Sequence, residues 1–358
     1  MPLAARFEEI ADPATLEPRW RAVEQAAAAP SFFLGWTWIG SWLDALAAAG
    51  IPLPRLLAIE GADGDVALAL IGEGRARRRF GNVPTIWLNE AGHGEGDRPF
   101  IEYNGLLCCA GAEAEAGRAF CAALAGRRDW RALYLSGVES SAMPLPEMAG
   151  IRRHVLRDAA PARFVDLDAV RAKDGAYLAL LSANTRGQMR RAMREDGASL
   201  SLDRAQDTAT VSEWLTETRR LNAGKHSDNA WDSSFFCDFA GRIARAGLAD
   251  GSVELLRVRA GSAVTGYLLN FIRAGQAMNY QSAFAEPRTA KSKPGLTAQA
   301  AAVMHYASRG LARYSFLAGR DRYKQSLSTD ADVLHWWTLE RFDWQLELEA
   351  LARRLLRR

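Results

Sequence analysis

The chain of 358 residues has few cysteines, few histidines and little excess charge of either sign. Its four cysteines show neither CxxC spacing nor the density of a disulfide framework, which indicates a reducing compartment and argues against a zinc ribbon. The 45 Lys and Arg residues against 42 Asp and Glu leave a net charge of +3, which is too small for nucleic-acid binding by bulk electrostatics. We therefore expect no metal site and no nucleic-acid partner.

Long apolar runs are also missing from the sequence. None approaches the roughly 18 to 20 uncharged residues that would span a bilayer. The N-terminal segment carries Glu8, Glu9 and Asp12 where a signal peptide would need a basic and then an apolar stretch. We expect a cytoplasmic protein, with peripheral contact to the inner face of the membrane as its only route to lipid.

The composition, 49% hydrophobic and 24% charged, is that of a globular protein. A chain of this length exceeds what one core usually organises, so two domains are expected. Three prolines and a charged stretch lie between Met143 and Pro161 and mark the boundary. The expected domains are residues 1–150 and residues 160–358.

The second half has the clearer pattern. Two amphipathic helices are predicted, then a three-stranded antiparallel meander with Ala-Gly turns, then a helix and a fourth strand. In chain order these elements are expected at Thr208–Asn222, Ser234–Ala246, Val253–Ala260, Ala263–Arg273, Gln276–Phe284, Pro294 to about Arg309, and Ala312–Leu317.

The start of the helix at Pro294 has the features of an anion site. The first turn of a helix has unpaired N–H groups and a partial positive charge, and Gly295 lets a phosphate approach the backbone. Lys291 and Lys293 add positive charge beside it. A Pro-Gly helix start is also a common structural device, so this pattern alone leaves both interpretations open.

The order of motifs around this helix resembles a known family. The segments 279–284 (NYQSAF) and 292–296 (SKPGL) are followed by a short strand that ends at Gly319 and by the pair Tyr323-Lys324. This order resembles the acetyltransferase domain of the GNAT superfamily, in its FemAB-like branch, which includes cellulose-biosynthesis-type acetyltransferases. The resemblance covers roughly residues 165 to 330, and the first half resembles the branch only loosely.

This resemblance implies an α+β fold of tandem GNAT-like lobes, each a mixed, mainly antiparallel sheet flanked by helices. It also implies acyl-CoA as a co-substrate, with no tightly bound cofactor, held where a strand and the following helix splay apart. The residues implied in donor binding are Gln281, Ser282, Ala283, Phe284, Ser292, Lys293, Pro294, Gly295, Leu296 and Lys324.

Three residues are candidates for catalysis. Tyr323 is placed to protonate the leaving thiolate, as a phenol does in many GNAT members, or else it caps the end of the strand. His226 lies in a polar loop and is either an acceptor-site residue or a solvated histidine. Relatives usually carry an acidic residue in the strand before Gly319, where this chain has Ser315, so the chain either does without this carboxylate or uses Asp321.

The resemblance implies N-acylation of an amine on an envelope or lipid precursor. The aromatic stripes favour a long-chain sphingoid amine as the acceptor, as in bacterial ceramide synthesis. Two alternatives stay open: aminoacyl transfer from a charged tRNA, and a non-catalytic module that binds CoA or another ligand. The Trp-rich stripes are interpreted as core and the basic terminus 353–358 as solvated surface. Alternatively, they form a membrane-facing segment together. Two arginine groups, at 75–79 and 186–194, stay open between solvated surface and anion contact.

Overall fold

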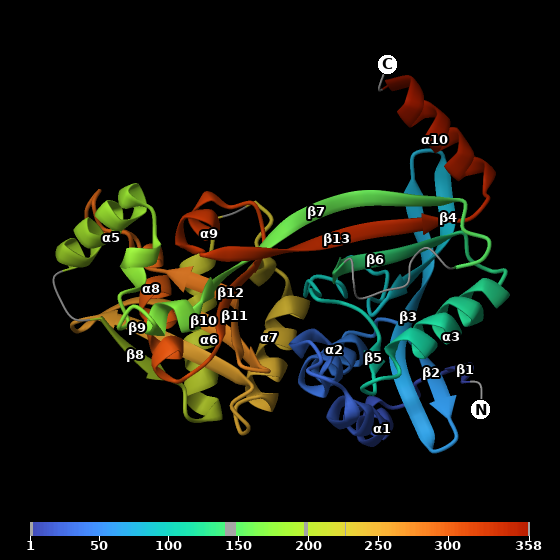
Figure 1. Cartoon of the computed structure of the whole chain (residues 1–358), viewed down its shortest axis with the longest axis horizontal. Coiled ribbons are helices and arrows are strands. Elements are labelled where there is room, and N and C mark those ends of the chain that lie inside the picture. Colours follow the sequence, from blue (N-terminus) through green and yellow to red (C-terminus); the bar gives the residue numbers. More distant parts are fainter. Residues whose placement is uncertain (1–2, 140–147, 197–199, 226, 357–358) are drawn as a thin grey trace. The chain divides into compact units, whose positions relative to one another are not determined.

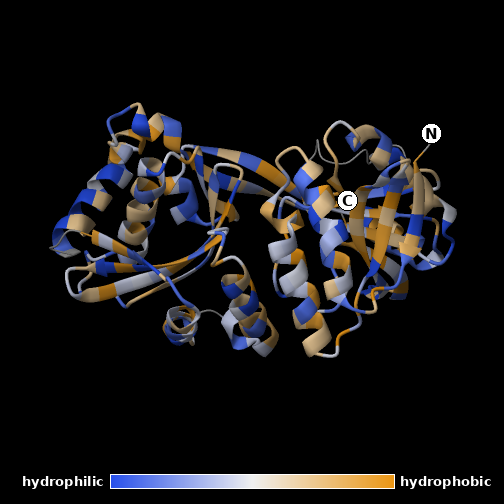
Figure 2. Cartoon of the chain, turned by 90° about the horizontal axis from the view of Figure 1, so that it is seen from below, coloured by the Kyte–Doolittle hydropathy of each residue, from blue (hydrophilic) through white to orange (hydrophobic). Residues whose placement is uncertain are grey.

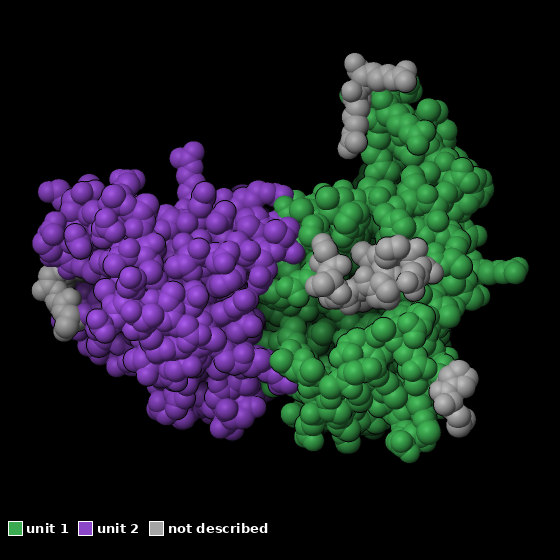
Figure 3. Space-filling model, viewed as in Figure 1, with its two compact units in different colours: residues 1–159, 334–358 green, residues 160–333 purple. Residues whose placement is uncertain are grey.

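The computed structural model describes residues 3–139, 148–196, 200–225 and 227–356, which form two compact units (Figures 1 and 3). Unit 1 consists of Met1–Ala159 with Leu334–Arg358, and unit 2 of Ala160–Val333. The first division between the two units falls between Ala159 and Ala160. The segment 334–358, expected in the second domain, instead belongs to unit 1, because its strand pairs with a strand of that unit.

Unit 1 is a mixed sheet covered by helices. Its strands are ordered β1-β2-β3-β4-β6-β13, and the short β5 pairs with β3. The strands are β1 Ala4–Glu8, β2 Arg55–Gly61, β3 Gly64–Arg78, β4 Gly81–Leu88, β5 Leu107–Cys108, β6 Ala132–Glu139 and β13 Asp330–Glu340. The helices are α1 Pro13–Ala26, α2 Trp36–Ala48, α3 Glu113–Gly126 and α10 Trp344–Leu356, with a 3-10 turn at Phe32–Leu34.

Unit 2 repeats this architecture. Its strands are ordered β7-β12-β11-β10-β9-β8. They are β7 Arg153–Asp166, which belongs to unit 2 from Ala160 onward, β8 Leu200–Arg204, β9 Val253–Ala260, β10 Ala263–Arg273, β11 Gln276–Phe284 and β12 Arg313–Ala318. The helices are α4 Leu167–Arg171, α5 Ala183–Asp196, α6 Thr208–Asn222, α7 Ser234–Ala246, α8 Pro294–Ser308 and α9 Arg322–Leu327, with 3-10 turns at Tyr177–Leu180 and Ala230–Asp232.

Local chemistry explains where the helices begin. Asp12 accepts a hydrogen bond from the N–H of Ala14 and caps α1, whose first residue is Pro13. Asp207 caps α6 through the N–H of Thr210, and Ser233 caps α7 through the N–H of Phe236. These polar residues directly precede the amphipathic patterns, so the helix starts follow from the sequence.

Each unit buries its own core. In unit 1, α3 packs Phe120 and Leu124 against strand residues such as Leu133 of β6, all with no exposed surface. In unit 2, α8 is apolar nearly all round and buries Val303 and Tyr306 among residues of the sheet. Figure 2 shows the same distribution, with hydrophobic residues concentrated along the strands.

The two units share one order of elements: a strand, two helices, three strands, a helix and a strand. Apart from the two-residue strand β5, which lies between β4 and α3, this order is β1, α1, α2, β2, β3, β4, α3, β6 in unit 1, and it is β8, α6, α7, β9, β10, β11, α8, β12 in unit 2. In both, the strand before the single helix pairs in parallel with the strand after it, over three residue pairs. The sequence shows no repeat that would have revealed this.

The predicted meander, its flanking helices and the following strand are confirmed almost to the residue. In the second half and at its boundary, β7, β8 and β13 were not predicted. β8 is short, β13 lies in the Trp-rich segment that we expected to be core, and β7 runs through the expected boundary. Strand pairing between distant segments forms these elements, and local sequence patterns do not report it.

Candidate active site

The site begins where β11 and β12 diverge in unit 2. The two strands pair only as far as Met278 and Ser315. A register shift in the pairing with β10 then leaves Tyr280 as an extra residue in β11. Beyond this bulge the edge of β11 that faces away from β10 has no ladder with β12, so an opening forms between them.

The backbone of Ser282 and Phe284 faces this opening. The N–H of Ala285 donates to the carbonyl of Thr265 in β10, so this peptide group points toward β10. Because successive peptide groups of a strand point to opposite sides, those of Ser282 and Phe284 point the other way. Side chains of the α6 end confirm this direction: Asn222 Nδ2 donates to the Ser282 carbonyl (3.3 Å) and Lys225 Nζ to the Phe284 carbonyl (2.7 Å).

The N-terminus of α8 borders the same opening. Its N-cap, Lys293, makes no side-chain capping bond, and Pro294 occupies the first turn. A Cβ added at Gly295 would lie 3.1 Å from the ring of Phe284. The glycine therefore permits close packing of α8 on β11, in addition to the close approach of a ligand that the sequence suggests.

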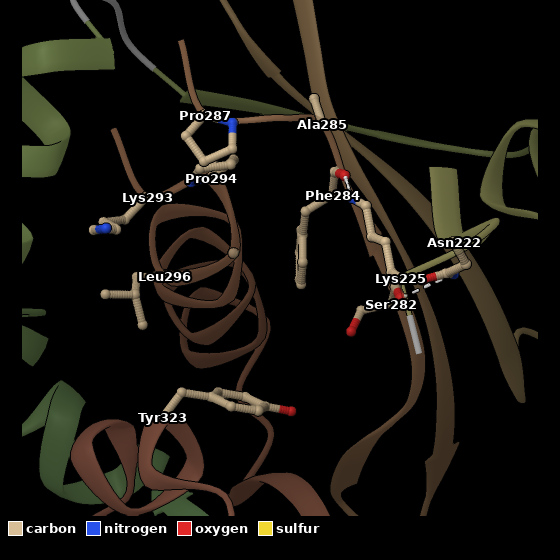
Figure 4. Close-up of a pocket in the computed structure, with 11 residues that line it drawn as sticks. Asn222, Lys225, Ser282, Phe284, Ala285, Pro287, Lys293, Pro294, Leu296 and Tyr323 are labelled. Carbon is tan, nitrogen blue, oxygen red and sulfur yellow. Dashed lines mark hydrogen bonds between the residues drawn. The ribbon is translucent and has the colours of Figure 1, made fainter. Parts of the chain in front are cut away.

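These elements enclose a cavity of about 480 Å³ (Figure 4). It is lined by Asn222, Lys225, Ser282, Phe284, Ala285, Pro287, Lys293, Pro294, Gly295, Leu296 and Tyr323. Seven of these were predicted from the sequence. The other four come from α6, its following loop and the end of β11, and sequence reasoning missed them because only the fold brings α6 to β11.

Tyr323 extends from α9 into this cavity. Its hydroxyl and that of Ser282 point toward the same space between α8 and β11 (Figure 4). Burial, and secondarily the charge of Asp321, raises the pKa of Tyr323 to about 12. The phenol is therefore protonated across the physiological range and can act as a proton donor.

The remaining predicted residues lie around the cavity without lining it. Gln281 accepts a hydrogen bond from Trp231 Nε1 (3.2 Å), and Ala283 is buried. Ser292 is buried before α8, and Lys324 Nζ donates to the Ala318 carbonyl (2.7 Å). Their roles in donor binding stay predictions.

Asp321 and Lys324 converge beside Gly319. A Cβ added at this glycine would lie 2.8 Å from Lys324 Nζ and 3.0 Å from Asp321 Oδ2. Asp321 precedes α9 without capping it through its side chain. The third catalytic candidate, His226, lies outside the described residues.

The described lining is cationic and apolar. Lys225 and Lys293 supply positive charge, while the described lining residues include no carboxylate, imidazole or thiol. The described part of the chain also contains no group of three or more His, Cys, Asp or Glu that could hold a metal ion. Such a lining suits an anionic ligand with an apolar portion and offers an acid, Tyr323, but no base.

A buried polar network supports the floor of the site. At the bulge, Asn279 Nδ2 donates to Asn270 Oδ1 (2.9 Å) and Asn279 Oδ1 accepts from Gln299 Nε2 (2.8 Å). Gln299 in turn accepts from the hydroxyl of Tyr314 (2.6 Å), which joins β11, α8 and β12. Each of these side chains is buried, so the network fixes the point at which the strands part.

A second buried group lies at the other end of α8. The fully buried Glu254 of β9 accepts hydrogen bonds from Tyr306 (2.9 Å) and from Arg309 Nη1 (2.7 Å). In the sequence, Glu254 is one of two carboxylates near strand ends to which no role could be assigned. The structure gives it a fixed role in holding α8 on the sheet, away from the cavity.

The equivalent opening of unit 1 is filled by the chain itself. β4 and β6 pair as far as Trp87 and Tyr134, and Asn104 then lies between them. Asn104 Nδ2 donates to the Leu88 carbonyl (3.0 Å), and its N–H donates to the Gly137 carbonyl (3.0 Å). The place that is a cavity in unit 2 is thus occupied by a loop in unit 1.

Comparison with known proteins agrees with this assignment. Residues 183–325 match the family model described as an acetyltransferase (GNAT) domain. The match begins in α5 and ends in α9, so it contains the cavity of unit 2 and every predicted site residue. No curated protein matches the chain in sequence.

Solved structures match over the whole chain at low identity. FemX covers 97% of this chain and 99% of its own, with 11% identity and a TM-score of 0.59. The C-terminal domain of a candidate lysylphosphatidylglycerol synthetase from Agrobacterium fabrum covers 94% and 95%, with 12% identity and a TM-score of 0.52. L-PGS from Bacillus licheniformis covers 98% of both chains, with 10% identity and a TM-score of 0.51. The predicted tandem fold is confirmed.

Proposed function

The chain carries an acetyltransferase (GNAT) domain over residues 183–325 within a FemX-like fold, and from this premise we propose that unit 2 transfers an acyl group from acyl-CoA to an amine. The observation that carries the proposal is the opening between β11 and β12, which runs from exposed strand backbone to the uncapped N-terminus of α8. A pantetheine amide can hydrogen-bond to the exposed strand backbone, and a pyrophosphate can bind at the N-terminus of α8.

The charges and shape of the cavity support an acyl-CoA donor. Lys293 lines the cavity at the start of α8, where we place the phosphates, and Lys225 lies at the end of β11. Phe284, Pro287 and Leu296 supply apolar contact for the thioester side. A volume of about 480 Å³ accommodates part of a CoA thioester, whose nucleotide then lies outside the cavity.

The chemistry is a single displacement. The neutral amine attacks the thioester carbonyl, a C–N bond forms, the C–S bond breaks, and CoA leaves as a thiolate. Tyr323 donates its proton to this sulfur, and the proton released by the amine passes to water or to a base outside the described lining. Because the phenol has a pKa of about 12, it stays protonated across the physiological pH range until it donates this proton.

The proposed acceptor is an amine of an envelope or lipid precursor, with long-chain sphingoid amines among the first to test. The resemblance to the FemAB-like branch and the name of one structural neighbour, a candidate lysylphosphatidylglycerol synthetase, both support an envelope or lipid product. The fold similarity to FemX also favours one alternative, aminoacyl transfer, which would use the same opening for a different donor.

Calorimetry and native mass spectrometry of the full chain against CoA, acetyl-CoA and palmitoyl-CoA would test the donor. We expect saturable binding, and release of free thiol when a long-chain amine is added. Binding of aminoacyl-tRNA without binding of any CoA would replace our proposal by aminoacyl transfer. Binding of CoA with no turnover on any amine would indicate a non-catalytic module.

A further inference from the structure

Helix α10 of unit 1 exposes an apolar stripe. Trp344, Leu348, Leu351 and Leu355 follow each other at spacings of four, three and four residues, which places them on one face of the helix. Their exposed fractions are 61, 43, 54 and 64%. On the opposite face Leu346 is fully buried with Val83 and Ala132. The helix therefore packs on unit 1 with one side and leaves a second apolar side uncovered.

Ion pairs fix α10 in this orientation. Glu349 pairs with Arg78 (3.0 Å), and Glu347 pairs with Arg153 (2.8 Å). Arg78 and Arg153 both also pair with Glu340, which has no exposed surface. Because these pairs lie on the packed side and its edges, the stripe is held facing outward.

Both flanks of the stripe carry aromatic and cationic side chains. On one flank the β3–β4 turn presents Arg79 over the ring of Phe80, which is 39% exposed, and Gln345 Nε2 donates to the Phe80 carbonyl (3.0 Å). Figure 1 shows α10 beside this hairpin. On the other flank Arg152 stacks over Phe342, which is 63% exposed.

The charges on this surface are mainly positive, and Arg152 also pairs with Glu347 (2.9 Å). Arg354 is exposed beside the stripe, whereas the two glutamates of α10, Glu347 and Glu349, are each paired with arginines. An apolar stripe between cationic flanks is complementary to a surface at which hydrocarbon chains lie directly beside anionic phosphate groups. A second copy of this chain fits poorly, because a symmetric contact would set arginines against arginines.

We propose that this surface binds an anionic lipid bilayer. We call it the α10 face: Phe80, Phe342, Trp344, Leu348, Leu351 and Leu355, with Arg79, Arg152 and Arg354. The stripe enters the boundary between headgroups and acyl chains, and the arginines contact lipid phosphates. The inference stands on unit 1 alone and does not depend on the proposed reaction of unit 2.

Co-sedimentation of the full chain with vesicles tests this proposal. We expect binding to phosphatidylglycerol–phosphatidylcholine vesicles that weakens several-fold as salt rises from about 0.1 to about 0.5 M, and little binding to phosphatidylcholine alone. The variant L348Q/L351Q/L355Q should lose at least about tenfold in vesicle affinity. The variant R79Q/R354Q should lose about tenfold or more on anionic vesicles only.

Met304→Gln is the matched control, because it changes an exposed apolar side chain of unit 2 that lies outside the α10 face. It should bind vesicles like the wild type, and circular dichroism should show that all variants are folded. Equal binding by the triple variant, or no preference for anionic vesicles, would overturn the proposal. A wild-type dimer that the triple variant dissociates would instead make the α10 face a contact between copies.

Discussion

At the scale of single residues, two titratable groups with raised pKa values separate the roles of the two units. Tyr323 is a phenol at the cavity of unit 2, and its raised pKa of about 12 keeps it a proton donor. Glu90 of unit 1 follows β4 and accepts a hydrogen bond from Ser136 Oγ (2.7 Å). Burial, with the nearby charge of Asp97, raises the pKa of Glu90 to about 8. The first group bears on chemistry and the second on stability.

Replacing Tyr323 by Phe should lower kcat of the proposed transfer by about 100-fold, because the thiolate then leaves without its proton donor. The dissociation constant for CoA should change little, since the ring is kept. Tyr267→Phe, which changes a phenol of β10 outside the cavity, serves as the control. Steady-state kinetics checks both; an unchanged kcat in Tyr323→Phe would assign this residue to packing at the start of α9.

Glu90 should make the protein less stable as pH rises. Its folded pKa of about 8 lies above the ordinary glutamate value of 4.5, so between these two pH values the native state keeps a proton that the unfolded chain releases. The stability associated with Glu90 is therefore full below about pH 4.5 and is lost as pH rises through about 8.

Glu90→Gln removes this dependence. Relative to the wild type, its free energy of unfolding should gain on the order of 1 to 3 kcal/mol between pH 5 and about pH 9. Urea denaturation at several pH values measures this. The exposed Glu115→Gln on α3 should show no such trend, and a flat difference for Glu90→Gln would mean that Glu90 is ionised in the native state.

At the scale of elements, the junction of β11 and α8 shapes the proposed donor site. The bulge at Tyr280 and the network through Asn279 and Gln299 set where β11 leaves β12. Gly295 then allows the first turn of α8 to lie against Phe284. The opening is thus produced by strand register and helix packing together.

Gly295→Ala should weaken CoA binding about five- to twentyfold. The added Cβ lies 3.1 Å from the Phe284 ring, so either this ring or the first turn of α8 must shift at the phosphate site. Gly187→Ala is a matched control in α5, where the nearest atom is 3.6 Å from the new Cβ. Calorimetry measures both; wild-type affinity in Gly295→Ala would remove the helix start from the donor site.

At the scale of the whole molecule, the two units share an order of elements but differ at the opening between their parallel strands. The opening is a cavity in unit 2 and is filled by Asn104 in unit 1. Gly137, at a φ of 63°, permits the filling loop to approach β6, since a Cβ there would lie 2.7 Å from the Ile101 carbonyl. One unit is open to a ligand at this position, and the other is closed by its own backbone.

We therefore expect the chain to bind one CoA and not two. Native mass spectrometry should show a single adduct at saturation, and calorimetry a stoichiometry near one per chain. Two adducts of comparable affinity would show that the loop around Asn104 leaves the opening of unit 1 under native conditions.

The sequence by itself determined the local structure of the second half and the identity of its ligand-facing helix. Helix caps, period-two strands and Ala-Gly turns act between near neighbours, so the helices and strands between residues 208 and 308 could be assigned almost to the residue. Ser282, Phe284, Gly295 and Tyr323, which we predicted as site residues, line the cavity, and their roles in binding and catalysis stay predictions. These features arise from backbone preferences and hydrophobic periodicity, which a sequence carries openly.

Only the tertiary structure decided the rest. Asn222 and Lys225 meet β11 about 60 residues later in the chain, and the C-terminal segment joins unit 1 through pairing of β13 with β6. The filling of the unit 1 opening by Asn104 likewise depends on contacts to Leu88 and Gly137. Such contacts depend on long-range strand pairing and on which face of each element becomes buried, and these are properties of the folded chain as a whole.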